Sequence, residues 1–223
     1  MDMKRLVVTG AGTSVIIKLV HAINRHQPTW DLVGFVDDDP GKKGALIHGY
    51  PVMGGLDLLA TEDLADAYTV CFIYGGNIQT RLQVIDRLDA MDATYATLVH
   101  PSVDLDLVTS GTDCVIQSGS HIQSDVAIGD HCGVGLEAII GHDVSVGDKV
   151  WIGPRATVLG RVKIEEGATL GAGCVIKGNV TVGSFAMVGM GAVVVHDVPA
   201  GTTVFGNPAR VINRGALDTR HPY

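Results

Sequence analysis

The chain has 223 residues and a mass of 23.4 kDa, enough for one large domain or two smaller ones whose apolar cores need no disulfide bonds. Apolar residues make up 46% and no apolar run approaches the ~20 residues of a membrane-spanning helix, which excludes a disordered chain and disfavours membrane insertion. The 16 basic and 24 acidic side chains give a formal charge of −8, so nucleic-acid binding is not expected.

The N-terminal segment and the cysteines indicate a cytoplasmic protein. The segment MDMKRLVVTGAG holds only a short apolar stretch broken by glycine, which does not fit a signal peptide. The cysteines form no Cys-x-x-Cys pair and suit a reducing compartment as small apolar residues. The four are Cys71, Cys114, Cys132 and Cys174.

The first 100 residues are predicted to alternate strands and helices. Strands are expected at 5–9, 32–36 and 69–74, and helices at 14–24, after Gly54-Gly55 and at 78–90. Strands separated by helical segments of this length indicate a small parallel, Rossmann-like α/β domain. We expect a domain boundary near His100-Pro101.

Two features of this domain suit a nucleotide. The turn from Gly10 through Ala11 to Gly12 joins the first strand to the first helix, where backbone N–H groups and the positive end of the helix can bind phosphate. Asp37 and Asp38 end the second strand, where a carboxylate can accept hydrogen bonds from a ribose or base. The alternative is that DDDPGKKG is an ordinary solvated turn.

Residues 101–223 carry a six-residue repeat. Stepping by six from Ile116 to Val194 gives fourteen aliphatic residues without exception, and the fourth residue after each is small. Glycine often follows the aliphatic residue, which suggests a corner with an unusual backbone angle. These glycines are Gly129, Gly135, Gly141, Gly147, Gly153, Gly171, Gly183 and Gly189.

A strict period of six fits a triangular parallel β-helix with 18 residues in each coil, because neither a helix nor an ordinary strand sustains it. The pattern resembles the left-handed β-helix of hexapeptide-repeat acyltransferases. A glycine-rich β-sandwich is the alternative, although it would show turns every 8 to 12 residues. Cys114 and Cys132, one coil apart, should stack inward as free thiols.

His142 is the histidine that the repeat favours for catalysis. His142 and His196 are 54 residues, or three coils, apart, so they share a corner, and each is followed by aspartate. His142 lies in the middle of the stack, whereas His196 enters the exit sequence HDVPAG. His131 and His142 fall at different hexad positions, so no zinc site is predicted.

The segments GFVDDDPGKKGALIHGYPVMGGLDLL, FIYGGNIQTR, ATLVHPSV, GHDVSVGD and HDVPAGTTVFGNPARV together resemble the NeuD/PglD-type bacterial nucleotide-sugar acetyltransferases. The resemblance covers nearly the full length. It implies a nucleotide-sugar-binding domain over 1–100, a β-helix acetyltransferase domain over 101–223, a homotrimer, and acetyl-CoA as co-substrate without a metal.

The resemblance assigns roles to residues of both domains. His142 is implied as the general base and Asp143 as the acidic neighbour that modulates it, while the Gly160 N–H, one coil further on, is the expected oxyanion donor. Trp151 stands where many members have a histidine, and Gly135 where many have an asparagine. The expected acetyl-CoA contacts are Gly160, Ala172, Met190, Trp151 and Arg210, and the expected sugar-nucleotide contacts are Gly10, Ala11, Gly12, Asp37, Asp38, Gly54, Asn77 and Arg81.

The leading hypothesis is therefore an acetyl-CoA-dependent N-acetyltransferase that acts on a nucleotide-linked 4-amino-deoxysugar during surface polysaccharide biosynthesis. One alternative keeps the fold and transfers acetyl to a sugar hydroxyl, as in sialic-acid O-acetylation. A second alternative is a trimer that binds nucleotide sugars without catalysis.

Overall fold

The computed structural model describes residues 3–73 and 78–213 of the chain. The chain divides into two compact units, Met1–Leu98 and Val99–Tyr223, called here the N-terminal unit and the β-helix unit. Within the described residues, no helix has the length and apolar character needed to cross a membrane.

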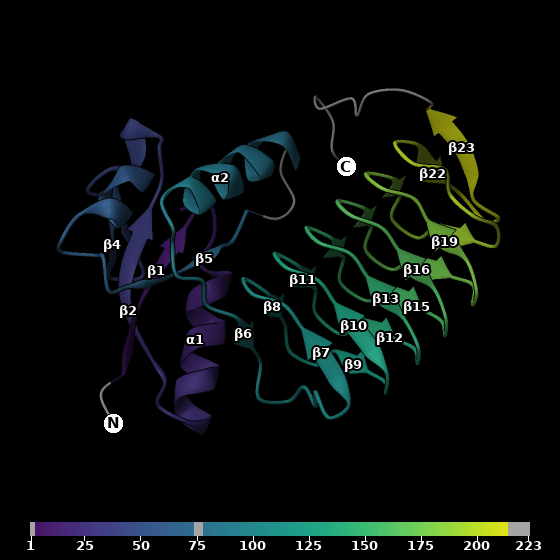
Figure 1. Cartoon of the computed structure of the whole chain (residues 1–223), viewed down its shortest axis with the longest axis horizontal. Coiled ribbons are helices and arrows are strands. Elements are labelled where there is room, and N and C mark those ends of the chain that lie inside the picture. The colour runs from purple at the N-terminus through teal and green to yellow at the C-terminus, as the bar shows by residue number, and fades with distance from the viewer. Residues whose placement is uncertain (1–2, 74–77, 214–223) are drawn as a thin grey trace. The chain divides into compact units, whose positions relative to one another are not determined.

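The N-terminal unit is built on a five-stranded sheet in the order β3-β4-β2-β1-β5 (Figure 1). All neighbours are parallel except β3, which runs antiparallel to β4. The strands are β1 (Lys4–Thr9), β2 (Trp30–Val36), β3 (Leu46–Ile47), β4 (Tyr50–Gly54) and β5 (Tyr68–Cys71). The prediction missed β3 and β4, because the short segment between Ala45 and Gly54 is rich in turn residues.

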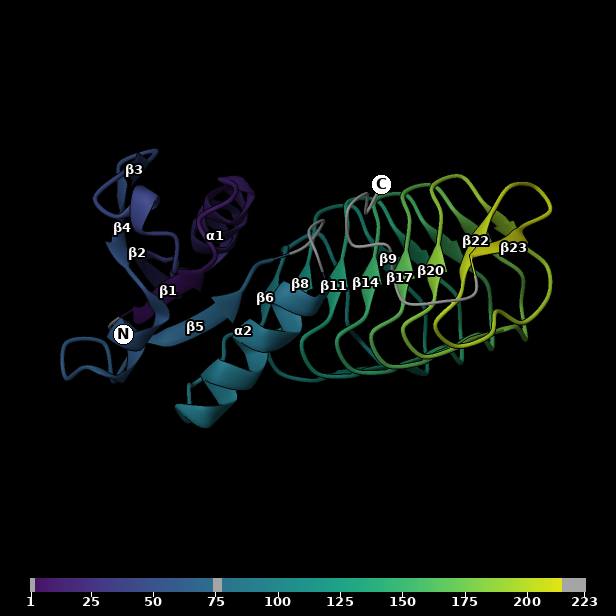
Figure 2. The same cartoon turned by 90° about the horizontal axis from the view of Figure 1, so that it is seen from above.

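Two α-helices lie on opposite sides of this sheet (Figure 2). They are α1 (Val15–His26) and α2 (Ile78–Ala90), and two short 3₁₀ helices, η1 (Pro40–Lys42) and η2 (Leu56–Ala60), connect other elements. Helix α1 buries Ile16, Ile17, Leu19 and Val20, which recur on one helical face. The central strand β1 buries Leu6, Val7 and Val8 completely.

The β-helix unit winds through three parallel sheets, here named after early strands. The β7 sheet has the order β19-β16-β13-β10-β7, the β9 sheet β21-β18-β15-β12-β9, and the β8 sheet β23-β22-β20-β17-β14-β11-β8-β6. Each strand pairs with the strand one coil away, as in Ile139↔Thr157 and Ile140↔Val158, so the predicted coil of 18 residues is confirmed. Figure 2 shows the coils stacked along one axis.

The strands of this unit are short, because each side of the triangle holds one hexad. They are β6 (Leu98–Val99), β7 (Val108–Ser110), β8 (Val115–Ile116), β9 (His121–Ile122), β10 (Val126–Ile128), β11 (Gly133–Val134), β12 (Ile139–Ile140), β13 (Ser145–Val146), β14 (Trp151–Ile152), β15 (Thr157–Val158), β16 (Lys163–Ile164), β17 (Thr169–Leu170), β18 (Val175–Ile176), β19 (Thr181–Val182), β20 (Met187–Val188), β21 (Val193–Val194), β22 (Thr203–Phe205) and β23 (Arg210–Asn213). Only β23 pairs antiparallel, with β22.

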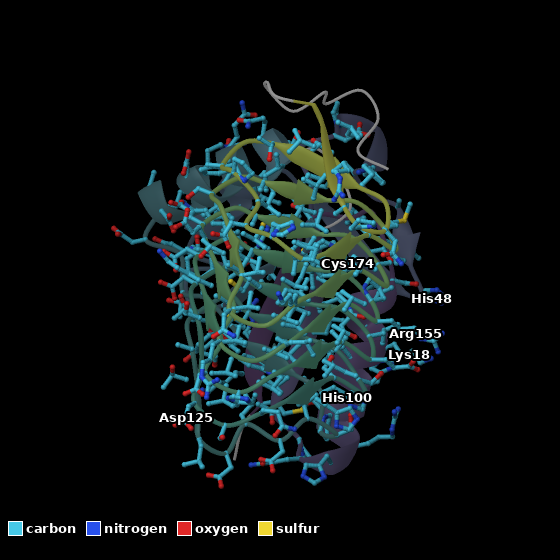
Figure 3. The ribbon with its side chains drawn as sticks, turned by 90° about the vertical axis from the view of Figure 1, so that its right-hand side faces the viewer. Lys18, His48, His100, Asp125, Arg155 and Cys174 are labelled. Carbon is cyan, nitrogen blue, oxygen red and sulfur yellow. The ribbon has the colours of Figure 1, made fainter. Side chains whose placement is uncertain are left out.

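The interior of the coils holds the aliphatic ladder and the small residues that follow it, as the sequence predicts. Cys174 lies inside the ring of coils, whereas Asp125 and Arg155 extend outward (Figure 3). Cys114 and Cys132 are both free thiols, and their Sγ atoms lie 3.2 Å from the Gly129 carbonyl oxygen and 3.1 Å from that of Gly147. Both thiols therefore pair with backbone carbonyl groups of the neighbouring coil.

The prediction of an unusual backbone angle at the glycines that follow the aliphatic residues is wrong. The left-handed conformation falls two residues later, at positions such as Glu137, Asp143 and Arg161, where φ is 55°, 57° and 61°. Glycine is needed at Gly141 for another reason: a Cβ there would lie 2.7 Å from the backbone nitrogen of Gly160 in the next coil. Close stacking of coils, rather than the local angle, selects these glycines.

Candidate functional site

His142 and Asp143 form a pair at the corner where β12 turns into β13. The His142 corner, as we name it, consists of residues 123–126, 141–144, 159–162, 177–180 and 195–198, one segment from each coil between the β9 and β7 sheets. The His142 Nδ1 atom lies 2.7 Å from Asp143 Oδ2, and the two side chains are 51% and 50% exposed. The pair is therefore intact and open to a substrate.

Residues of the next coil, 159–162, contact this pair. The Arg161 N–H donates to the His142 carbonyl oxygen at 2.9 Å, and Arg161 Nε lies 3.8 Å from Asp143 Oδ2. A Cβ on Gly160 would lie 2.6 Å from His142 Nε2 and 2.8 Å from Cε1. The imidazole ring therefore rests on the bare backbone of Gly160, and any larger residue would displace it.

This arrangement suits general base catalysis. A carboxylate that holds Nδ1–H fixes the tautomer of an imidazole and leaves Nε2 with a lone pair. Within the described residues, His142 Nε2 has no hydrogen-bond partner, and the Gly160 N–H beside it donates to no acceptor. The ring that can accept a proton thus rests on a residue whose backbone N–H could serve an oxyanion, the two groups that catalysis of acyl transfer uses.

The structure does not bring the other predicted acetyl-CoA contacts to His142 within one chain. Trp151 faces outward from β14 in the β8 sheet, opposite the His142 corner, and Arg210 begins β23 at the end of that sheet. Ala172 and Met190 follow β17 and β20, at the corner between the β8 and β9 sheets. The reason is arithmetic: Ala172 is 30 residues after His142, which is one coil of 18 plus two sides of the triangle.

The N-terminal unit contains a cavity of about 570 Å³ at the carboxyl ends of its central strands. Gly10, Gly12, Asp37 and Asp38, four of the expected sugar-nucleotide contacts, line this cavity, whereas Ala11 lines an adjoining cavity of about 480 Å³ beside His48. Sequence reasoning missed the further lining residues Thr9, Thr13, Lys42, Phe72 and Thr80. Ligands of open α/β sheets bind at this edge.

Asp37 organises one wall of the larger cavity. Its Oδ2 atom accepts hydrogen bonds from the Ala11 N–H at 2.8 Å and from Lys42 Nζ at 2.8 Å, and Oδ1 accepts from the Asp39 N–H at 3.0 Å. Partial burial by itself raises the pKa of Asp37, but these three donors together lower the pKa below its ordinary value. The carboxylate is therefore ionised and holds both the glycine turn and Lys42 in place.

Asp38 has a structural role as well as a place in the cavity wall. Its Oδ1 atom accepts the Leu56 N–H at 3.0 Å, and Oδ2 pairs with Arg87, which also binds Asp57 at 2.9 Å. Sequence reasoning missed the contact between Asp38 and Arg87, because these residues are 49 apart in the chain. A nucleotide that binds Asp38 therefore has to share the Asp38 carboxylate with the Leu56 N–H and the Arg87 guanidinium.

The remaining predicted sugar-nucleotide residues occupy different environments. Gly54, at the end of β4, accepts the Asp37 N–H on its carbonyl oxygen at 2.7 Å and lies behind the cavity wall. Arg81 is buried in α2 and does not line the cavity, and Asn77 lies outside the described residues. Ser14, which precedes α1, makes no side-chain capping bond, but the Val15 N–H donates to Thr13 Oγ1 at 3.2 Å and the Ile17 N–H to the Ser14 carbonyl oxygen at 3.1 Å.

No group of three His, Cys, Asp or Glu side chains that could hold a metal occurs in the part of the chain that the structure describes. His131 and Asp113 form a buried pair, whose Nδ1 and Oδ2 atoms lie 2.9 Å apart.

Family comparisons agree with both units. The PglD N-terminal domain matches residues 5–88, the bacterial transferase hexapeptide repeat matches residues 143–178, and the hexapeptide repeat of succinyl-transferase matches residues 125–154. No curated protein matches the chain.

Solved structures match nearly the whole chain. The acetyltransferase domain of PglB from Neisseria gonorrhoeae, in complex with acetyl coenzyme A, is 30% identical with a TM-score of 0.84, covering 95% of this chain and 100% of that one. WeeI from Acinetobacter baumannii is 28% identical with a TM-score of 0.79, covering 95% and 100%. PerB from Caulobacter crescentus, in complex with CoA and GDP-perosamine, is 25% identical with a TM-score of 0.83, covering 95% and 99%.

A relative that shares 30% identity over its full length, together with matches to both domain types, places the chain in a family. The reading as a non-catalytic binding protein is thereby set aside. The chain belongs to the PglD-type nucleotide-sugar acetyltransferases, and it is an acyltransferase that uses acetyl-CoA as its co-substrate.

Proposed function

We propose that this protein transfers the acetyl group of acetyl-CoA to the amino group of a nucleotide-linked 4-amino-deoxysugar, with His142 as general base. The observation that carries the proposal is the His142–Asp143 pair resting on Gly160, with the His142 side chain half exposed. The relative PerB was solved with CoA and GDP-perosamine, a nucleotide amino sugar, which supports an amine as acceptor.

In this reaction the lone pair of the sugar amine attacks the thioester carbonyl carbon while His142 Nε2 accepts the proton that the new C–N bond releases. Asp143 stabilises the resulting imidazolium through its bond to Nδ1. The Gly160 N–H donates to the tetrahedral oxyanion. Collapse of this intermediate breaks the C–S bond, and the thiolate of CoA leaves and takes up the proton from His142.

Direct transfer requires no acyl-enzyme intermediate. The four cysteines are all buried. A nucleophilic cysteine needs exposure and a lowered pKa beside a base. Burial instead raises the pKa of Cys174 to about 12.

We assign residues 1–100 to binding of the nucleotide sugar and residues 101–223 to acetyl transfer. Gly10, Gly12 and Thr13, which precede α1, line the cavity of about 570 Å³, and the N–H groups of Gly12 and Thr13 can donate to a diphosphate. Lys42 adds a positive charge to the cavity wall. Because the protein has a net charge of −8, attraction for a diphosphate has to come from such local groups. Asp37 and Asp38 present carboxylate oxygens to the base or ribose. We also propose a cytoplasmic location, because a reducing compartment suits the buried free thiols.

We further propose that three copies assemble through the β9 sheet. Ile139 on this sheet is 44% exposed, and Leu136, Leu159 and Met190 at its borders are 45%, 45% and 51% exposed. Closed threefold packing would bury this apolar face. It would also allow Ala172 and Met190 of a second copy to approach the His142 corner, which they cannot do in their own chain. Sedimentation at micromolar concentration tests this, and a monomer would contradict it.

The reaction is tested by incubation with acetyl-CoA and a panel of UDP-, dTDP- and GDP-linked amino sugars, with release of the CoA thiol as the readout. We expect turnover with at least one 4-amino sugar and an alkali-stable amide in the product by mass spectrometry. Alkali-labile acetate would identify the acceptor as a hydroxyl instead. Absence of turnover with every acceptor would refute the proposed substrate class.

A further inference from the structure

Arg87 joins three elements around the cavity of about 570 Å³ in the N-terminal unit. Its Nη1 atom donates to Asp38 Oδ2, and its Nη2 atom donates to Asp57 Oδ1 at 2.9 Å. Asp38 belongs to the loop after β2, Asp57 to η2, and Arg87 to the last turn of α2. One guanidinium group thus links segments that lie 49 and 30 residues away from it in the chain.

Each of these three elements supplies part of the cavity wall. The wall includes Asp38 from the loop after β2, Leu56 from η2, and Thr80 and Val84 from α2. Arg87 itself lines neither this cavity nor the adjoining one of about 480 Å³. Arg87 can therefore act on a ligand of the larger cavity only through the groups that it holds.

Arg87 and the Leu56 N–H together fix the carboxylate of Asp38. The Leu56 N–H donates to Oδ1 at 3.0 Å and Arg87 donates to Oδ2, so both oxygens are held. A carboxylate oxygen can accept two hydrogen bonds, which leaves capacity on Asp38 for a ligand. Without Arg87, only the bond to Oδ1 would restrain this side chain, which is 45% exposed, and a ligand would have to order it on binding.

Apolar packing holds the same region together independently of Arg87. Elements η2, β5 and α2 share one buried cluster, formed by Leu56, Cys71, Ile85 and Leu88. The Arg87 side chain is 45% exposed, and exposed ion pairs contribute little to the stability of a fold. Removal of Arg87 should therefore release the Asp38 carboxylate and leave the N-terminal unit folded.

We infer that Arg87 is a positioning residue for the nucleotide sugar, because it holds the Asp38 carboxylate in the orientation that the ligand meets. The inference rests on the proposed binding of a nucleotide sugar in this cavity. Arg87→Gln should raise the KM for the nucleotide sugar by about 3- to 10-fold, the effect of one side chain that has to be ordered on binding. The kcat and the KM for acetyl-CoA should stay unchanged.

The main test is calorimetric binding of UDP, dTDP and GDP to the full-length protein, which requires no acetyl transfer. For each nucleotide that the wild type binds, we expect Arg87→Gln to raise the Kd by about 3- to 10-fold. Arg87→Lys keeps the charge but not the fork that reaches both carboxylates, so it should recover part of the affinity. Arg5→Gln is the matched control. Arg5 pairs with Asp66 at 2.6 Å near the start of β1, at the opposite end of the sheet, and its removal should leave the Kd unchanged.

A double-mutant cycle with Asp38→Asn separates positioning from simple attraction between charges. If Arg87 acts through Asp38, Arg87→Gln has no further effect on the Kd in the Asp38→Asn protein. If the full loss persists in that background, Arg87 attracts the diphosphate directly and the inference is wrong. A wild-type Kd in Arg87→Gln would overturn it as well.

The outcomes also distinguish this inference from the proposed function. Acetylation of a sugar by a protein whose Arg87→Gln variant has an unchanged Kd would support the function and reject the role of Arg87. Weaker nucleotide binding by Arg87→Gln without acetylation of any sugar would support that role and reject the acceptor class. A wild type that binds none of the three nucleotides would overturn both. The melting temperature of Arg87→Gln should shift by no more than about 2 °C, and a larger fall would show a structural role instead.

Discussion

The contact between Gly160 and the imidazole of His142 makes Gly160→Ala a sensitive test of the site. The new methyl group would lie 2.6 Å from Nε2, 2.8 Å from Cε1 and 3.0 Å from Cδ2 of His142. Atoms in van der Waals contact need about 3.5 Å, so the ring has to move by roughly 0.9 Å. That shift disturbs the 2.7 Å bond to Asp143 as well as the position of Nε2. A misplacement of about 1 Å lowers kcat by about 10²-fold.

The same substitution should hardly affect stability. The ring is the end of a half-exposed side chain that can swing into solvent, so the free energy of unfolding should change by less than about 1 kcal/mol. Steady-state kinetics and thermal unfolding of Gly160→Ala are compared with the wild type, and a double-mutant cycle adds His142→Ala. In the His142→Ala background the methyl group meets no ring, so Gly160→Ala should cost nothing further. Wild-type kcat in Gly160→Ala would refute the reasoning.

Three further outcomes follow from the structure. His142→Ala should lower kcat by about 10²-fold or more and leave CoA binding by calorimetry nearly unchanged, whereas wild-type activity would show that another group is the base. Because the pKa of Asp37 is lowered from its ordinary value of 3.8, the ionised carboxylate stabilises the fold, and Asp37→Asn should lower the free energy of unfolding measured in urea at neutral pH. The difference between Asp37→Asn and the wild type should vanish as the pH falls through the lowered pKa. A difference that persists in acid would contradict this origin. Because burial raises the pKa of Cys174 to about 12, iodoacetamide at pH 8 should leave it unmodified in the native protein and label it only after unfolding, as mass spectrometry of peptides would show.

The sequence predicts most of the β-helix because its period states the fold directly. Every sixth residue from Ile116 to Val194 is aliphatic, and each one lies where an inward position was expected. The same period also predicts that His142 and His196 share a corner. What it cannot give is how a second copy of the chain packs against these corners. Ala172 and Met190 are acetyl-CoA contacts implied by the family resemblance, and in a single chain they lie at the corner between the β8 and β9 sheets, away from His142.

Contacts between residues far apart in sequence could not be predicted either. Arg87 pairs with Asp38 across 49 residues of sequence, and this contact arises only when α2 and the loop after β2 have come together. The sequence shows glycine after the aliphatic residues but not its cause, because the cause is the backbone of the next coil, which a single sequence does not reveal. The signal that could have found Lys42 was its position five residues after Asp37, at the end of the same loop.

Asp143 and Arg161 adopt the same left-handed corner conformation, with φ of 57° and 61°, and Asp125 shares it at 60°. A non-glycine residue in this conformation carries a cost of about 1 to 2 kcal/mol, and asparagine or aspartate bears it best. The backbone at these corners is thus equivalent from one coil to the next, and only side chains distinguish the reactive one. Histidine and aspartate placed at the same corner of a neighbouring coil, with glycine in the coil that follows, would reproduce this arrangement one coil along the axis. The reactive position of this fold can therefore be moved by changing a few side chains.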